Sequence, residues 1–223
     1  LAALAAPGDL DTSFSADGMV TTDIGSADSG RAVAVQSDGK IVVVGIANNE
    51  SNDDIAIVRY DTNGDLDTTF STDGKTVVDI DSKNDYGYGV VVQSDGKIVV
   101  AGASATDAFG LSFDFAVIRL TATGDLDTTF STDGIHTIGV GTGTDYAYDV
   151  AVQSDGDVVL AGYGTNGANF DIAVVRLTSA GVLDTDFSGD GKVLVPVGAG
   201  HDYGYAVAVA SDGDIVVAGS SHN

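Results

Sequence analysis

The feature that most constrains this chain is an internal repeat. The segment GDLDTSFSADG at residues 8–18 returns in closely similar form at 64–74, 124–134 and 181–191. A turn like QSDGK recurs at 36–40, 93–97, 153–157 and 210–214, and a segment like DIAIVRY recurs at 54–60, 114–120 and 171–177. The three motifs follow one another in a fixed order, and each recurs at intervals of about 57 residues. This pattern indicates one structural unit built four times. The units cover residues 8–63, 64–123, 124–180 and 181–223.

One unit contains four predicted strands. In the second unit these cover 76–80, 86–93, 97–104 and 113–120, with a tight Asp-Gly hairpin turn at 94–96. The third strand is apolar without alternation, which indicates that both of its faces are covered. Four-stranded antiparallel sheets in a repeated array are typical of β-propeller blades, so we expect an all-β propeller. Its last blade would lack the final strand, because the fourth unit has no DIAIVRY segment.

Composition agrees with this fold and excludes several classes of protein. The 223 residues include 33 acidic and 9 basic ones, a formal net charge of −24, and every acid except Glu50 is Asp. Asp favours turns over helices, as expected of a β protein with many turns. The charge argues against nucleic acid as a partner, and the lack of cysteine excludes disulfides and thiolate metal sites. No run of apolar residues is long enough to span a membrane.

The three motifs together resemble the delta-sixty repeat family, a bacterial β-propeller repeat of secreted and surface proteins. The resemblance rests on residues 66–74, 93–102 and 113–120 and extends over 8–219. It implies a propeller, an extracellular or cell-surface location and adhesin-like relatives, and it implies no catalytic residues. This chain departs from such arrays because it holds only four units, one of them incomplete.

The N-terminal segment 1–7 has two interpretations. It reads like the small-residue end of a secretory signal peptide, and Leu1–Leu4 also aligns with the strand at 57–60. It could therefore complete the last blade of its own ring. Alternatively, the chain is part of a longer propeller, or one chain completes the next in a dimer, ring or filament.

The segment after the fourth predicted strand of the first unit alternates oxygen-bearing side chains, as calcium loops do. This makes Asp61, Asn63, Asp65 and Asp67 a candidate calcium site and calcium the one cofactor considered. The full set occurs in one unit only, so Asx-turn chemistry is the alternative.

Two sets of recurrent residues are predicted to be structural. Three of the four arginines share one repeat position, and we expect each to bind a repeated Asp carboxylate or backbone carbonyls: Arg59, Arg119 and Arg176. One aromatic residue recurs in each crossover and is expected to anchor neighbouring blades: Phe14, Phe70, Phe130 and Phe187.

Paired tyrosines form the candidate binding surface. Within each pair the residues are two apart on one strand: Tyr86 and Tyr88, Tyr146 and Tyr148, Tyr203 and Tyr205. They could stack a sugar or contact a protein, or simply pack between blades. The insertion at 104–113, with Phe109, is a second candidate.

The residues that break the repeat form no nucleophile, base and orienter set, so we expect no enzyme activity. The expected function is a non-catalytic structural or adhesive module of a secreted or cell-surface bacterial protein, whose partner is a protein or a second copy. The alternative is a glycan-binding or hydrolytic propeller that uses its central channel or the 104–113 loop.

Overall fold

The computed structural model describes residues 8–223 as fourteen strands with no helix among them. The predictions for residues 1–7, a signal remnant or a completing strand, lie outside the described residues. The strands form three sheets of four and one of two, all with antiparallel pairing. The predicted all-β propeller architecture is confirmed. No helix among the described residues could span a membrane.

The strands follow the chain from sheet to sheet. The first sheet holds β1 (Asp28–Val35), β2 (Ile41–Asn48), β3 (Asp53–Tyr60) and β4 (Lys75–Val78). The second holds β5 (Asp85–Val92), β6 (Ile98–Ala105), β7 (Phe113–Leu120) and β8 (Ile135–Ile138). The third holds β9 (Tyr146–Val152), β10 (Val158–Thr165), β11 (Phe170–Leu177) and β12 (Lys192–Val195). The fourth holds β13 (Asp202–Val209) and β14 (Ile215–Ser221).

The blade boundary differs from the predicted one by one strand. The strand expected to open a unit, such as β4, instead closes the preceding sheet, where Ile55 pairs with Val78. The reason lies in the crossover, which folds back on β3: the Asp67 amide bonds to the Arg59 carbonyl, and the Arg59 amide to the Gly74 carbonyl. The last sheet therefore has two strands, rather than the three expected when only a final strand was missing.

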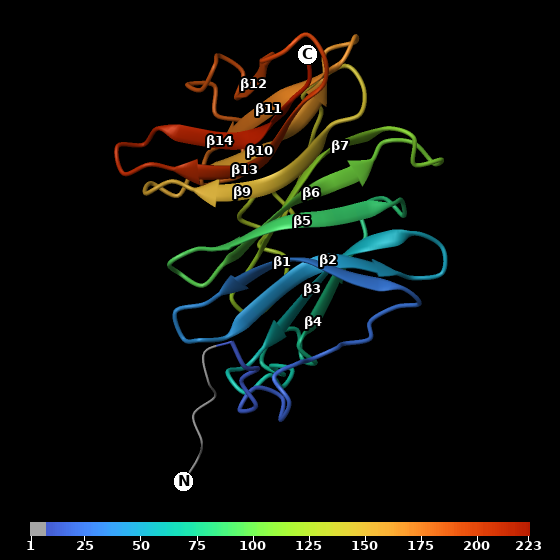
Figure 1. Ribbon diagram of the computed structural model, residues 1–223, viewed down its shortest axis with the longest axis vertical. Helices are drawn as coiled ribbons and strands as arrows, with labels where there is room; N and C mark the ends of the chain where they lie inside the picture. Colours follow the sequence, from blue (N-terminus) through green and yellow to red (C-terminus); the bar gives the residue numbers. More distant parts are fainter. Residues whose placement is uncertain (1–7) are drawn as a thin grey trace.

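The sheets stack face to face in chain order (Figure 1). Strands β1, β5, β9 and β13 lie side by side along one edge of the stack, each touching the next. Apolar clusters fill the spaces between the sheets, and every residue of β6 is buried. That burial confirms that this unalternating strand is covered on both faces.

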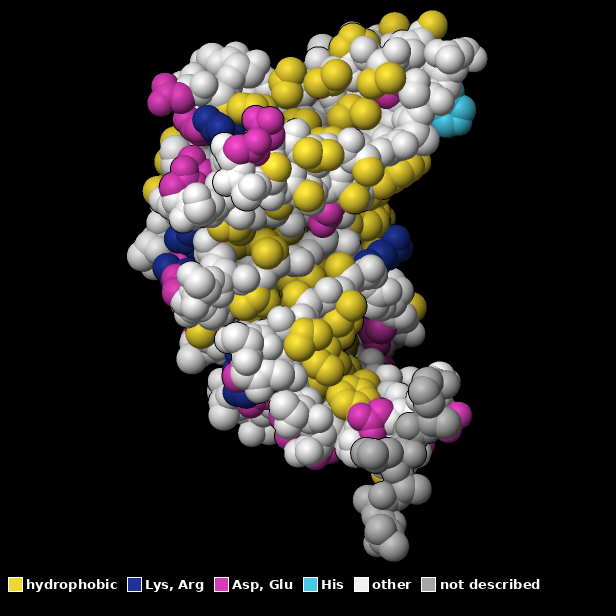
Figure 2. Space-filling view, turned by 60° about the vertical axis from the view of Figure 1, so that its left-hand side comes forward, with side chains coloured by type: hydrophobic (Ala, Val, Ile, Leu, Met, Phe, Trp, Pro, Cys, Tyr) yellow, Lys and Arg dark blue, Asp and Glu magenta, His cyan; other side chains and the backbone are white. Residues whose placement is uncertain are grey.

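The first and fourth sheets lie at opposite ends of the stack (Figure 1). The described residues therefore form an open arc and not a closed ring. Apolar side chains reach the surface along its length (Figure 2), and several lie on the two end sheets: Val33, Val35 and Val216 are 64%, 69% and 57% exposed. These exposed side chains are apolar, like those that fill the spaces between the sheets.

Candidate functional site

Arg59 and Arg119 each join their own sheet to the crossover of the next. Arg59 Nε donates to Asp67 Oδ2 at 2.8 Å, and Nη1 donates to the Ala122 carbonyl at 2.6 Å. Lys40 contacts the same Asp67 oxygen at 2.9 Å. Both kinds of partner expected for the arginine, a carboxylate and a carbonyl, are present. We call Arg59, Asp67 and Lys40 the first clamp.

The second clamp repeats this geometry and the third is reduced. Arg119 donates to Asp127 at 2.8 Å and to the Ser179 carbonyl at 2.6 Å, and Lys97 lies 3.1 Å from Asp127. Arg176 bonds to Asp184 at 2.6 Å, but its side chain is 22% exposed against 5% for Arg119. The lysine position holds Asp157 in that unit. The third clamp is thus the weakest.

Electrostatics favour ionised carboxylates in the first two clamps. Burial alone would raise the pKa of Asp67, but hydrogen bonds from Lys40 and Thr69 and the charge of Arg59 outweigh it and lower that pKa well below its usual range. The pKa of Asp127 is lowered in the same way, against its burial, by Thr129, Lys97 and Arg119.

Three of the recurrent phenylalanines lie beneath the clamp arginines. Each guanidinium lies over one ring, at 4.7 Å for Arg59 and Phe70, 4.5 Å for Arg119 and Phe130, and 5.0 Å for Arg176 and Phe187. The rings also abut glycines of the following crossover, so a Cβ on Gly64, Gly124 or Gly181 would crowd Phe14, Phe70 or Phe130. These aromatics connect successive units.

The structure does not bring the candidate calcium ligands together as a site. Asp61 Oδ1 accepts the backbone amides of Asn63 at 2.8 Å and Asp65 at 3.0 Å, which is the Asx-turn alternative. Asp67 points away into the first clamp, where Arg59 and Lys40 take the same oxygen. The alternating spacing in this segment therefore reflects turn formation and salt bridging.

Three other carboxylates do converge, between the first and second sheets. Oxygens of Asp54, Asp79 and Asp85 lie within 4.8 Å of one another. Asp54 and Asp85 are buried and Asp79 is exposed. Burial raises the pKa of Asp85 to about 7, and the negative charges of Asp54 and Asp79 add to that effect. Sequence reasoning missed this cluster because its members come from three different segments.

A column of side chains crosses all four sheets along the β1, β5, β9 and β13 edge. In each of these strands the register shifts by one residue, and the skipped residue is Arg31, Tyr88, Tyr148 or Tyr205. Such β-bulges re-aim a side chain away from the regular alternation. Neighbours in the column touch: the Arg31 guanidinium lies 5.1 Å from the Tyr88 ring, Tyr88 5.2 Å from Tyr148, and Tyr148 5.7 Å from Tyr205.

The other member of each tyrosine pair contacts aromatic rings of the neighbouring strands. The ring centroids of Tyr86 and Phe113 are 5.3 Å apart, those of Tyr146 and Tyr163 5.4 Å, and those of Tyr203 and Phe170 5.9 Å. These contacts fit packing between sheets. Burial raises the pKa of Tyr88 to about 12, whereas Tyr205, at the end of the column, is 52% exposed. The column is thus mostly packed, with an accessible ring at one end.

The insertion after β6 presents an exposed apolar tip. Phe109 and Leu111 are 84% and 78% exposed. The Asp107 carboxylate shapes the tip by accepting the backbone amides of both residues, at 2.7 and 3.3 Å. The tip lies on a different part of the chain from the column and shares no residue with it.

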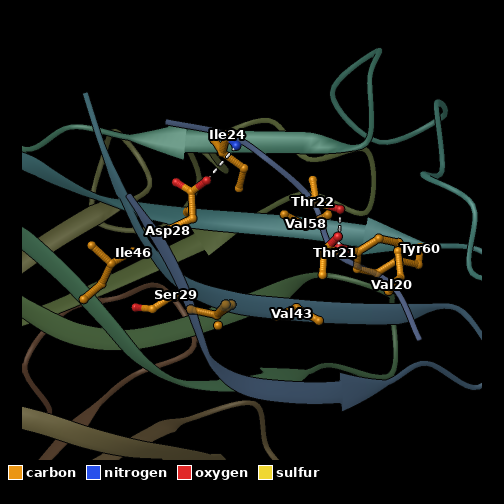
Figure 3. Close-up of a pocket in the computed structure, with 14 residues that line it drawn as sticks. Val20, Thr21, Thr22, Ile24, Asp28, Ser29, Val43, Ile46, Val58 and Tyr60 are labelled. Carbon is orange, nitrogen blue, oxygen red and sulfur yellow. Dashed lines mark hydrogen bonds between the residues drawn. The ribbon is translucent and has the colours of Figure 1, made fainter. Parts of the chain in front are cut away.

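A groove of 330 Å³ lies between the first sheet and residues 20–24, which run across that sheet. Its lining includes Val20, Ile24, Val43 and Val58, and Thr22 bonds to the Tyr60 hydroxyl at 2.6 Å (Figure 3). The groove opens on the face of the first sheet that points away from the second. Sequence reasoning did not identify it.

Comparison with known protein families identifies the type of repeat. The family model described as "Domain of unknown function (DUF5122) beta-propeller" matches residues 36–70, 93–130 and 153–187. The chain carries β-propeller repeats. Those three matches fall on the second and third strands and the crossover of the first three sheets. The matching repeats thus contain the arginine clamps, for which the family description names no function.

Other comparisons add little about activity. No curated protein matches the chain. Among solved structures it is similar to a catalytically inactive variant of virginiamycin B lyase from Staphylococcus aureus with quinupristin. That similarity has 13% identity and a TM-score of 0.33, and it covers 88% of this chain and 71% of the lyase chain. A likeness this distant carries no argument about function.

Proposed function

We propose that this chain is a non-catalytic structural or adhesive module of a secreted or cell-surface bacterial protein, and that it associates with a partner protein or with a second copy. One observation carries the proposal. Large apolar side chains are exposed on the described surface, and Phe109 and Leu111, at the tip of the insertion after β6, are 84% and 78% exposed. Exposed apolar patches are typical of surfaces that a partner covers.

The proposed extracellular location rests on composition and resemblance. The charge of −24 without cysteine suits a protein in a cation-containing medium. The resemblance to repeats of secreted and surface proteins points the same way. Secretion of the intact precursor from its host, followed by fractionation, tests the location directly; recovery in the cytoplasm alone would contradict it.

Solution mass against concentration tests the association. We expect the mass measured by analytical ultracentrifugation to rise with concentration, and electron microscopy of concentrated protein to show rings or filaments. Because the exposed surfaces are apolar, association should persist at high salt, where surface ion pairs are screened. A single monomeric species at all concentrations would contradict association with a second copy.

A second function, glycan binding, is supported by the bulges. All four re-aim one residue into a single column, which ends in the exposed ring of Tyr205. Aromatic rings of this kind stack against sugar faces, while their hydroxyls remain available for hydrogen bonds. Titration with soluble oligosaccharides tests it. Binding that disappears in Tyr205→Ala but survives in Phe109→Ala would support the column over the insertion loop as the site.

A further inference from the structure

The junction of the first and second sheets holds a carboxylate that the later junctions lack. Two of its three aspartates, Asp54 of β3 and Asp85 of β5, keep their positions in the next two units. Their counterparts are Asp114 with Asp145 and Asp171 with Asp202. The third, Asp79 after β4, is replaced by Gly139 and Pro196 at those junctions. The cluster of Asp54, Asp79 and Asp85 is therefore a local departure from the repeat.

The charges of this cluster have no cationic side chain beside them. Oxygens of the three residues lie within 4.8 Å of one another, and Asp54 and Asp85 are only 3% and 0% exposed. The ion pairs among the described residues all involve other aspartates. Buried carboxylates are normally paired with a cationic side chain or bound to a metal ion.

Asp85 also has an unused acceptor in this place. Its Oδ2 accepts the Ile80 amide at 2.6 Å. The Ser104 hydroxyl lies nearby, but no described residue donates to Oδ1 in hydrogen-bond geometry. In the next unit the corresponding oxygen, Asp145 Oδ1, accepts the Thr165 amide at 2.9 Å. A buried oxygen without a donor, beside two further carboxylates, suits a bound cation.

Neutral donors hold the other two carboxylates in place. The side-chain amides of Asn52 and Asn49 donate to the two oxygens of Asp54 at 2.7 and 2.8 Å. The backbone amide of Ser82 donates to Asp79 Oδ1 at 2.7 Å. These bonds orient the carboxylates without neutralising them, as the hydrogen bonds around metal ligands do.

The type of donor atom indicates the kind of ion. Carboxylate oxygens suit hard cations such as calcium and magnesium. Calcium accepts irregular geometry with bonds of about 2.3–2.6 Å, whereas magnesium needs nearly octahedral geometry at about 2.0–2.1 Å. Two ligands on opposite sides of a calcium ion can thus stand about 5 Å apart. Oxygens within 4.8 Å of one another can therefore all reach one calcium ion.

We infer that Asp54, Asp79 and Asp85 bind one calcium ion at the junction of the first and second sheets. The exposed Asp79 gives the ion access from solvent, and water completes its coordination. The ion connects β3, the end of β4 and β5, so it fastens the two sheets together. This site goes beyond the proposed function and does not depend on it.

The junction of the third and fourth sheets is the internal comparison. Asp171 and Asp202 also have one buried oxygen each without a donor. Pro196 stands in the place of Asp79, so that junction offers two carboxylates instead of three. Calcium affinity rises with the number of charged ligands, so the first junction binds the ion more tightly.

The metal-free cluster relieves its own repulsion by holding a proton. Burial raises the pKa of Asp85 to about 7, and the charges of Asp54 and Asp79 add to that effect. A divalent cation displaces such a proton, because carboxylates bind metals in their ionised form. Binding is therefore measured at pH 8, on protein first freed of metal with a chelator.

Thermal melting against calcium concentration tests the site. We expect a Kd in the range of extracellular calcium modules, about 10⁻⁴–10⁻³ M. At ten times this Kd and constant ionic strength, the melting temperature of the unchanged chain should rise by roughly 3–6 °C. Isothermal titration calorimetry should give one ion per chain.

Two variants and a matched control locate the ion. Asp79→Asn removes one charge at an exposed position and keeps the acceptor for the Ser82 amide, so the chain should fold. Asp85→Asn removes the buried charge. Each should lower calcium affinity at least about tenfold. Asp61→Asn removes the same charge from an exposed turn, keeps the oxygen that forms that turn, and should retain the full melting shift.

Three results would overturn the inference. The first is the lack of a calcium-dependent shift in the unchanged chain up to about 10 mM. The second is an equal shift in Asp79→Asn and Asp61→Asn, because calcium would then only screen the net charge. The third is an equal shift with magnesium at the same concentration, because the wide spacing of the oxygens favours calcium.

Discussion

Replacing Arg119 with Met tests whether the clamps hold neighbouring sheets together. Methionine keeps much of the apolar stem of arginine and removes the guanidinium. The change deletes the bonds to Asp127 and to the Ser179 carbonyl, at 2.8 and 2.6 Å. It leaves Asp127, which is 5% exposed, with Lys97 as its remaining cation at 3.1 Å.

The expected cost follows from those contacts. Removing one partner of a buried ion pair costs about 3–5 kcal/mol, and the retained Lys97 keeps this loss at the lower end. The lost carbonyl bond adds about 1 kcal/mol. We therefore expect Arg119→Met to lower the free energy of unfolding by about 4 kcal/mol. For a chain of this size that corresponds to a melting temperature lower by roughly 8–16 °C.

The assay is thermal melting at neutral pH, with Arg176→Met as the matched control. Arg176 makes the same carboxylate bond, but its side chain is four times more exposed, at 22%, so we expect a cost of about 1 kcal/mol. Lys97→Met in the Arg119→Met background should cost more than Lys97→Met alone, because both cations share Asp127. Equal melting shifts for Arg119→Met and Arg176→Met would refute the clamp as the source of stability.

Three further predictions concern packing and pH. Between pH 5 and 7 stability should fall as pH rises, because burial raises the folded-state pKa of Asp85 to about 7, and such a group stabilises the fold only while it is protonated. Carboxylates with lowered pKa already contribute fully above about pH 5, and burial also raises the pKa of Asp54, Asp114 and Asp157, so Asp85→Asn should reduce the fall in melting temperature across this range. Tyr148→Ala should cost about 2–3 kcal/mol in denaturant unfolding, and Tyr205→Ala less than about 1, because Tyr148 touches rings on both sides. Gly102→Ala should cost about 3 kcal/mol or prevent folding, because the new Cβ would collide with the Tyr86 carbonyl oxygen beside a bulge; a normal yield and melting temperature would contradict the close approach.

The strands were predictable because they combine two local signals. Unbroken apolar runs identify buried strands, and Asp-Gly turns identify hairpins; the strands predicted at 86–93, 97–104 and 113–120 agree with β5, β6 and β7 to within one residue. The partners of the arginines were expected because three of the four arginines share one repeat position, and a repeated donor needs a repeated acceptor. The lysines of the clamps were missed, although Lys40 and Lys97 recur at one position in the sequence.

Features that depend on contacts distant in the chain were not predictable. The sheet boundary is set by how the crossover folds back on β3, and a repeat can be divided into units at any point along its length. The bulges leave a weak trace, because the strand opposite each one carries a glycine where the two backbones approach, as Gly102 does opposite Gly87. The carboxylate cluster of Asp54, Asp79 and Asp85 required three segments to be placed in space.

Departures from the repeat carry the functional information in this molecule, because a strict repeat only repeats structure. They are spread along the stack. Arg31 replaces a tyrosine in the first sheet, the second sheet carries the insertion with Phe109 at its exposed tip, and the third clamp is without its lysine. A site grafted on a symmetric frame breaks the repeat at one place within it. The insertion of the second sheet is such a break, which is why we expect a specific contact there.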